Sequence, residues 1–289
     1  MASRSTLKGA GRALGIGVIG AAFLFPLYWM VTMSFKPQEE WNPTGKTIWF
    51  PEHATLDNYR NILGLTNQNT QFFQASSTDA SQPIIHSLVA AGGGTILAMV
   101  VGVLAAYGIA RFRAGGRLLP FQILQLRMFP PVAIIIPLLI MLAYLKMFDT
   151  YWGLWLVYAA VTFPFVVWLM RSFFQELPRE IGEAAIVDGC TQWGAFFKAI
   201  LPNVKGGIAA TGLFVFILNW SDFLIALVLT TEKKITAPVF LNSLQSAGAG
   251  QEYGPQAALG LILVLPPAIL GLAIQRYLVR GLTFGAIKR

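Results

Sequence analysis

Few side chains in this chain of 289 residues have the types and the spacing that catalysis or metal binding requires. The two histidines, His53 and His86, stand far apart in the sequence and lack the one-turn spacing of paired metal ligands on a helix. Cys190 is the sole cysteine, which excludes an intrachain disulfide and a site built from several thiolates. We therefore predict no catalytic residue, no metal site and no bound cofactor on this chain.

Residues 15–20 read Gly-Ile-Gly-Val-Ile-Gly, which formally matches the glycine pattern of a dinucleotide-binding turn. Such a turn needs a preceding strand and a surrounding βαβ unit, whereas this stretch lies inside a long apolar run. The chain also lacks the Gly-x-x-x-x-Gly-Lys-Ser/Thr pattern of a phosphate-binding loop. We expect that any ATP and magnesium used by this system bind to another chain.

Arg127 is a charged residue inside a long apolar run, and it comes just before Phe129 and Pro130. An arginine at the centre of a membrane helix costs about 2.5–3.5 kcal/mol on insertion scales, so it normally faces a protein interior or a watery cavity. Prolines break helices, and broken helices near the bilayer midplane form transport sites in many carriers. The segment around Arg127 indicates a solute pathway. The alternative is that residues 118–127 lie along the membrane interface, the true span starts later, and the arginine side chain reaches the lipid headgroups.

A second polar group, Asn219-Trp220-Ser221-Asp222, lies deep in a later apolar run. The aspartate would be costly in lipid, so we expect it to face the helix bundle. There it would pair with the arginine, cap a break in the helix or line the pathway, and the sequence does not choose among these roles. Our candidate pathway residues are Arg127, Phe129, Pro130, Asn219 and Asp222.

Composition identifies the elements that must position these groups. The chain is 55% hydrophobic and 12% charged, with a mean hydropathy of +0.61, whereas soluble domains carry about twice that charged fraction. An apolar run of about 20 residues spans a bilayer as a helix. The sequence therefore predicts an all-α membrane protein with six transmembrane helices in a single domain over residues 1–289. The six runs cover residues 14–33, 84–109, 119–145, 152–173, 208–230 and 257–278.

The second predicted span carries a small residue at every fourth position, from Ala90 through Gly94, Ala98 and Gly102 to Ala106. Small faces let helix backbones approach closely in lipid. We predict that this face packs against another helix, either of this chain or of a partner.

The net charge of +8 comes from 21 Lys and Arg residues against 13 Asp and Glu residues. With the amino terminus placed in the cytoplasm, most of the basic residues fall in loops on the cytoplasmic side. Because positively charged loops stay inside, we predict that both termini and the loop around Glu183 are cytoplasmic. The charge is explained by membrane orientation, so we expect contact with lipid and none with nucleic acid.

Residues 34–83 form the longest external segment, which is rich in Asn, Gln, Thr and Ser between residues 66 and 82. One short helix is expected within it, over residues 56–63. The segment is either a solvated loop or a docking surface for an external partner.

The most informative segment is a polar interruption between two apolar runs, assigned to a cytoplasmic loop over residues 174–206. Good helix formers fill residues 180–188, Gly189 suits a left-handed helix end, and Thr191 suits the cap of a second, amphipathic helix. Pro202 is expected to stop that helix. These residues together predict a rigid helix–turn–helix to which a partner protein can bind. Its candidate contact residues are Glu183, Ala184, Ala185, Asp188, Gly189, Ile200, Leu201 and Pro202.

This pattern, Glu-Ala-Ala followed by a glycine and a terminating proline, resembles the coupling loop of ATP-binding-cassette (ABC) importer permeases. Over about residues 26–289 the chain is similar to the carbohydrate-uptake permeases of the maltose-transport type, in particular to the second of their two permease subunits. A longer stretch over residues 66–82, and Asp222 where many members have Glu, depart from that family. The other segments that carry the resemblance are Met128-Phe129-Pro130-Pro131, Asp149-Thr150-Tyr151-Trp152-Gly153-Leu154, Phe163-Pro164-Phe165, Asn219-Trp220-Ser221-Asp222-Phe223 and Gly281-Leu282-Thr283-Phe284-Gly285-Ala286-Ile287-Lys288.

The resemblance implies a type I ABC importer permease fold in the bacterial inner membrane. It implies a heteromeric complex with a homologous permease subunit, two copies of a cytoplasmic ATPase that bind ATP and magnesium, and an external solute-binding protein. This chain would form half of the pathway for a sugar or a related polyol and would hydrolyse nothing. Its cytoplasmic tail, residues 281–289, would insert between the ATPase subunits.

Two other functions stay open. An ion-coupled secondary transporter would need several carboxylates within the membrane or an internal repeat, and the spans offer essentially Asp222 alone. An importer of glycerol or glycerol phosphate would share the fold and differ in its solute, so the sequence does not separate it from a sugar importer.

Overall fold

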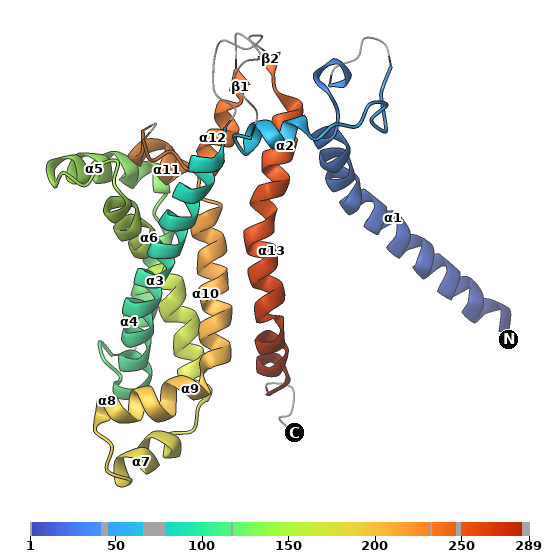
Figure 1. Ribbon diagram of the computed structural model, residues 1–289. Coiled ribbons are helices and arrows are strands. Elements are labelled where there is room, and N and C mark those ends of the chain that lie inside the picture. The colour runs from blue at the N-terminus through green and yellow to red at the C-terminus, as the bar shows by residue number, and fades with distance from the viewer. Residues whose placement is uncertain are drawn as a thin grey trace. The chain divides into compact units, whose positions relative to one another are not determined.

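The computed structural model describes residues 2–41, 46–65, 79–116, 118–231, 233–246 and 250–284, and most of them are helical (Figure 1). The chain divides into two compact units, Met1–Ser81 with Leu241–Val264 and Gln82–Phe240 with Leu265–Arg289. Residues 66–78 and 285–289 lie outside the described residues. The expectations for the polar external stretch and for the end of the tail therefore stay predictions.

The first unit is built from helices and one very small hairpin. The short helix expected over residues 56–63 is confirmed, because helical conformation there covers six residues. The hairpin pairs two strands of two residues each, and it is the one departure from an all-α fold in the described parts of the chain. The elements are α1 (Ala2–Ser34), η1 (Gln38–Glu40), α2 (Asp57–Ile62), β1 (Gln245–Ser246), β2 (Gly250–Gln251) and α13 (Tyr253–Phe284), whose second half belongs to the other unit.

The chain between residues 81 and 243 is helical, and α7 and α8 lie at the opposite end of these helices from α5 and α11 (Figure 1). In chain order the elements are α3 (Ser81–Phe112), α4 (Leu119–Gln125), the 3-10 turn η2 (Leu126–Met128), α5 (Pro131–Tyr144), α6 (Tyr151–Glu176), α7 (Glu180–Val187), α8 (Gln192–Ala195), the π-helix η3 (Phe196–Ile200), α9 (Leu201–Asn203), α10 (Lys205–Trp220), α11 (Leu224–Leu229) and α12 (Ala237–Ser243).

Within the described residues, four helices are long and apolar enough to cross a membrane, and six spans result if each of two bent helix pairs counts as one. The predicted span over residues 119–145 is such a pair, with a bend of 95° between its halves. The boundaries predicted for residues 208–230 are wrong. There α10 ends at Trp220 and α11 begins at Leu224, because the polar residues between them interrupt the helix.

The helices α3, α6 and α10 pack through small residues. A Cβ built on Gly94 would lie 2.7 Å from the Tyr158 Cβ, and one built on Gly102 would lie 2.6 Å from Val166 Cγ1. Both contacts join α3 to α6, while α10 packs on the same helix α6. The prediction that the small-residue face of the second span packs against a helix is confirmed, and that helix belongs to this chain.

Candidate functional site

The first helix of the predicted helix–turn–helix is α7, and it ends through the turn chemistry that the sequence indicates. Gly189 has a φ of +87°, and its amide donates to the Ile186 carbonyl at 3.0 Å. The Cys190 amide donates to the Ala185 carbonyl, also at 3.0 Å. These two bonds form a Schellman motif, which satisfies carbonyls that a helix end leaves without donors. The prediction of a left-handed glycine at this helix end is confirmed.

The second helix begins where predicted, because Thr191 Oγ1 accepts the Gly194 amide at 3.1 Å and so caps α8. Pro202 was predicted to stop this helix, and the helix passes through the proline and ends one residue later, at Asn203. A proline has no amide hydrogen to donate to the preceding turn, and the wider π-turn just before it accommodates that loss. Asn203 Nδ2 also donates to the Ala199 carbonyl at 2.7 Å, and the chain then bends by 76° into α10.

One face of α7 is fixed to the helix core. A Cβ built on Gly182 would lie 3.2 Å from Ile200 Cδ1, so the two helices of this element touch closely at that point. Ile200 and Phe196 are almost fully buried, and both belong to the cluster that contains Val166 of α6 and Val215 of α10. A force applied to α7 therefore reaches α6 and α10 through close contacts and without a flexible linker.

The candidate contact residues of this element divide by exposure. Those on the outer face are free for a partner, and those on the inner face hold the element in place. Their role in docking stays a prediction. Exposed are Glu183, Ala184, Asp188, Gly189 and Pro202, half-buried are Ala185 and Leu201, and buried is Ile200.

Two candidate pathway residues, Arg127 and Phe129, line an apolar cavity of about 590 Å³ between η2, α5, α6 and α11. The Arg127 guanidinium lies over the Phe165 ring, with 4.5 Å from its Cζ to the ring centroid. Pro130 comes directly before α5, in extended conformation, and so belongs to the bend between α4 and α5. The structure thus brings the arginine to a cavity wall at a broken helix, as the pathway hypothesis expects, and solute contact stays a prediction.

Asn219 and Asp222 do not line this cavity, and each makes a hydrogen bond to another helix. Asn219 Nδ2 donates to Thr95 Oγ1 at 3.1 Å, which ties α10 to α3. Asp222 Oδ2 accepts the Tyr158 hydroxyl at 3.2 Å and the Ala226 amide at 3.1 Å. Of the three roles that the sequence left open for the aspartate, the structure supports capping of a helix break. None of the ion pairs between described residues joins it to the arginine.

Sequence reasoning missed a second junction, at the start of α6. Asp149 has a φ of +54°, and its carboxylate accepts the Thr231 amide at 3.0 Å and the Thr231 hydroxyl. Thr150 caps α6 by accepting the Gly153 amide at 3.1 Å. The Thr-x-x-Gly spacing was a signal for the cap, since threonine is a favoured N-cap residue. Nothing local indicated the bond to a threonine beyond α11.

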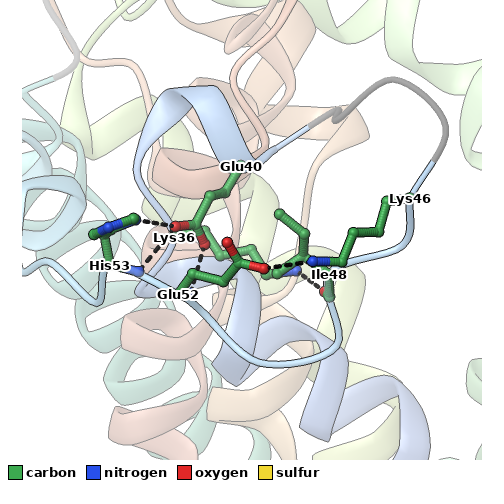
Figure 2. A network of polar contacts seen from close by, with 6 residues as sticks. All are labelled: Lys36, Glu40, Lys46, Ile48, Glu52 and His53. Atoms are coloured by element: carbon green, nitrogen blue, oxygen red, sulfur yellow. Dashed lines mark hydrogen bonds and ion pairs between the residues drawn. The ribbon is translucent and has the colours of Figure 1, made fainter.

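The segment after α1, predicted to be external, is folded around two buried charged side chains (Figure 2). Glu40 accepts the amides of Glu52 and His53 at 3.0 and 2.9 Å, and its Oε1 lies 3.2 Å from His53 Nδ1. Lys36 Nζ donates to the Ile48 carbonyl, and burial lowers the pKa of this lysine. A solvated loop would not bury both charges, so residues 36–53 have a defined shape where described. The docking role stays a prediction.

The comparison with known proteins identifies the class of protein. The chain matches the family described as "Binding-protein-dependent transport system inner membrane component" over residues 98–284. It is 36% identical to a probable ABC transporter permease of Sinorhizobium fredii, covering 94% of this chain and 92% of that one. It is 35% identical to a trehalose transport system permease of Mycobacterium tuberculosis, covering 94% of each chain. It is also 33% identical to a trehalose/maltose transport system permease of Thermococcus litoralis, and this match covers 95% of each chain.

The fold agrees with the sequence matches. The chain is similar to a chain of a bacterial ABC transporter involved in import of the acidic polysaccharide alginate, with a TM-score of 0.74. The two are 20% identical, and the match covers 95% of this chain and 97% of the other. The prediction of an ABC importer permease fold is confirmed, and a permease of this kind works with an ATPase and a solute-binding protein. This chain belongs to the family of inner-membrane components of binding-protein-dependent transport systems, and it is a multi-pass permease subunit of an ABC importer.

Proposed function

We propose that α7 and the turn after it form the docking element for a cytoplasmic ATPase, and that this permease conducts a sugar or a related polyol. The observation that carries the docking proposal is a short helix with one exposed face and one anchored face. Glu183 and Ala184 lie exposed on α7 and Asp188 lies exposed at its C-cap, while Gly182 on the other face meets Ile200 of the buried cluster. Small exposed residues let a partner surface come close, and the carboxylates attract basic groups.

The anchoring gives this element a mechanical role. Two copies of the ATPase bind ATP and magnesium, and their closure pushes α7 against the core cluster. Because Ile200 and Phe196 lie in one cluster with α6 and α10 side chains, the push shifts these helices together. A homologous permease subunit supplies the other half of the pathway. The loaded binding protein biases the same equilibrium from outside, so ATP and solute are coupled through two packings of one bundle.

The proposed solute class rests on the relatives. The trehalose and trehalose/maltose transport system permeases match this chain over almost its whole length. A polyol such as glycerol, or glycerol phosphate, is the competing solute. An ion-coupled transporter finds no support in the described spans, because the Asp222 carboxylate is already engaged by a hydroxyl and an amide. The orientation with both termini, including the tail over residues 281–289, in the cytoplasm is part of the same proposal.

The first test is purification of the tagged chain from its membrane in mild detergent, followed by identification of the copurifying subunits. ATP hydrolysis by the complex is then measured with its binding protein and a panel of sugars and polyols. Hydrolysis stimulated by one sugar supports the proposal and names the solute. A chain that purifies without an ATPase would refute it.

A charge reversal tests the docking element itself. Glu183→Lys is expected to abolish uptake while membrane insertion stays intact, because it places a cation where basic groups of the partner dock. Glu39→Lys is the matched control, since Glu39 is also an exposed glutamate but lies in the segment after α1. Normal uptake by Glu183→Lys, or an equal loss in both variants, would count against α7 as the docking element.

A further inference from the structure

A cleft of about 790 Å³ opens where the C-terminal end of α3, the turn leading into α4 and the end of α6 come together. Four arginines line it, two from the ends of membrane helices and two from the adjoining turns. Two glutamates, Glu176 and Glu180, line the same cleft. The four are Arg111, Arg113, Arg171 and Arg179.

Two of these arginines are held inside the cleft wall. Arg111 Nη2 donates to the Leu177 carbonyl at 2.9 Å, which ties the end of α3 to the link between α6 and α7. The Nε atoms of Arg111 and Arg171 are both buried, and neither has a hydrogen-bond partner in the structure. A buried charged donor without an acceptor is costly, so an anionic group that contacts these two guanidinium groups would be favoured.

The positive charge of the cleft exceeds its negative charge. No ion pair between described residues includes any of the four arginines or the two glutamates. The four positive charges therefore exceed the two negative ones. The excess lies at the ends of α3 and α6, two helices that qualify as membrane spans, and phosphate groups of lipids lie at that depth.

Apart from Gln175, the remaining lining is apolar or glycine, with Ile109 of α3, Phe174 of α6 and Pro120 of α4 among it. A soluble anion gains no binding free energy from this apolar surface. A phospholipid can place its phosphate on the guanidinium groups and its acyl chains against the apolar residues. Guanidinium groups also match phosphate oxygens in bidentate geometry.

We propose that this cleft binds the phosphate of an anionic phospholipid from the membrane leaflet on the α7 side. The bound lipid stabilises the link at residues 177–179, which positions α7. Binding is independent of the transport proposal, whereas its effect on coupling rests on the proposed docking role of α7.

The test uses the purified complex, equilibrated with vesicles of phosphatidylglycerol and phosphatidylcholine in equal parts, and measures the bound lipid by native mass spectrometry. Arg171→Gln is expected to lower the affinity for phosphatidylglycerol by about tenfold or more, because it removes one charge-assisted hydrogen-bond donor group. Arg113→Gln is the second variant, on an exposed side chain outside the regular helices. Arg60→Gln is the matched control, since this exposed arginine pairs with Asp57 on α2 and does not line the cleft.

Three outcomes overturn the proposal. The first is unchanged phosphatidylglycerol binding in both cleft variants. The second is an equal loss in the Arg60→Gln control. The third is full displacement of the lipid by millimolar inorganic phosphate, which would assign the cleft to a soluble anion. ATPase copurification and hydrolysis are recorded in parallel. A loss of lipid with intact docking supports the site, and a loss of docking without loss of lipid counts against it.

Discussion

The turn after α7 allows a prediction whose size follows from one backbone angle. Gly189 has a φ of +87°, and a Cβ built there would meet no heavy atom within 4 Å. A side chain at this position therefore adds no clash, and its cost is the left-handed backbone alone. That cost is about 1–2 kcal/mol for an ordinary L-residue and less for asparagine, which tolerates this region.

Gly189→Val should therefore reduce the population of the intact turn by about 5- to 30-fold, and Gly189→Asn by much less. The local assay is hydrogen exchange of the Cys190 amide, whose bond to the Ala185 carbonyl closes the turn. The functional assay is ATP-driven uptake in proteoliposomes, which should fall steeply for the valine variant while the chain still inserts. If the valine variant exchanges and transports like the original protein, the reasoning that this glycine holds the docking element in shape is refuted.

Thr191→Ala, but not Thr191→Ser, should destabilise the purified protein by about 1 kcal/mol in thermal unfolding, because the side chain caps α8. Gly102→Leu should cost about 1–3 kcal/mol, since a Cβ there would already lie 2.6 Å from an α6 side chain, whereas Gly108→Leu has open space and serves as its control. Arg127→Gln and Asp222→Ala should both change uptake while the ATPase still copurifies. Release of the ATPase by either variant would assign that residue to packing of the complex.

The helix–turn–helix could be predicted from the sequence because its determinants are local. A left-handed glycine and a threonine cap each act within three or four residues, so their spacing alone places α7 and α8. The limit of local reasoning is Pro202. A proline predicts a helix end, and the helix ends one residue after it, preceded by a π-turn that local spacing did not indicate. Phe196 and Ile200 of that π-turn are buried against side chains of other helices.

The break after α10 was only one of three possibilities that the sequence left open for Asp222, because its determinants lie far apart in the chain. An apolar run with one aspartate reads as a continuous span, since sequence does not show which partners relieve the cost of the charge. In the structure, the Asp222 carboxylate takes one donor from the amide of Ala226, which is local, and one from the hydroxyl of Tyr158 on α6. The bond from the Tyr158 hydroxyl is the tertiary contact that lowers the cost of placing this carboxylate inside the bundle. The bond between Tyr158 and Asp222 joins the start of α11 to α6, which also packs against α3 and α10. If these helices rearrange, either α11 moves together with α6 or this hydrogen bond breaks.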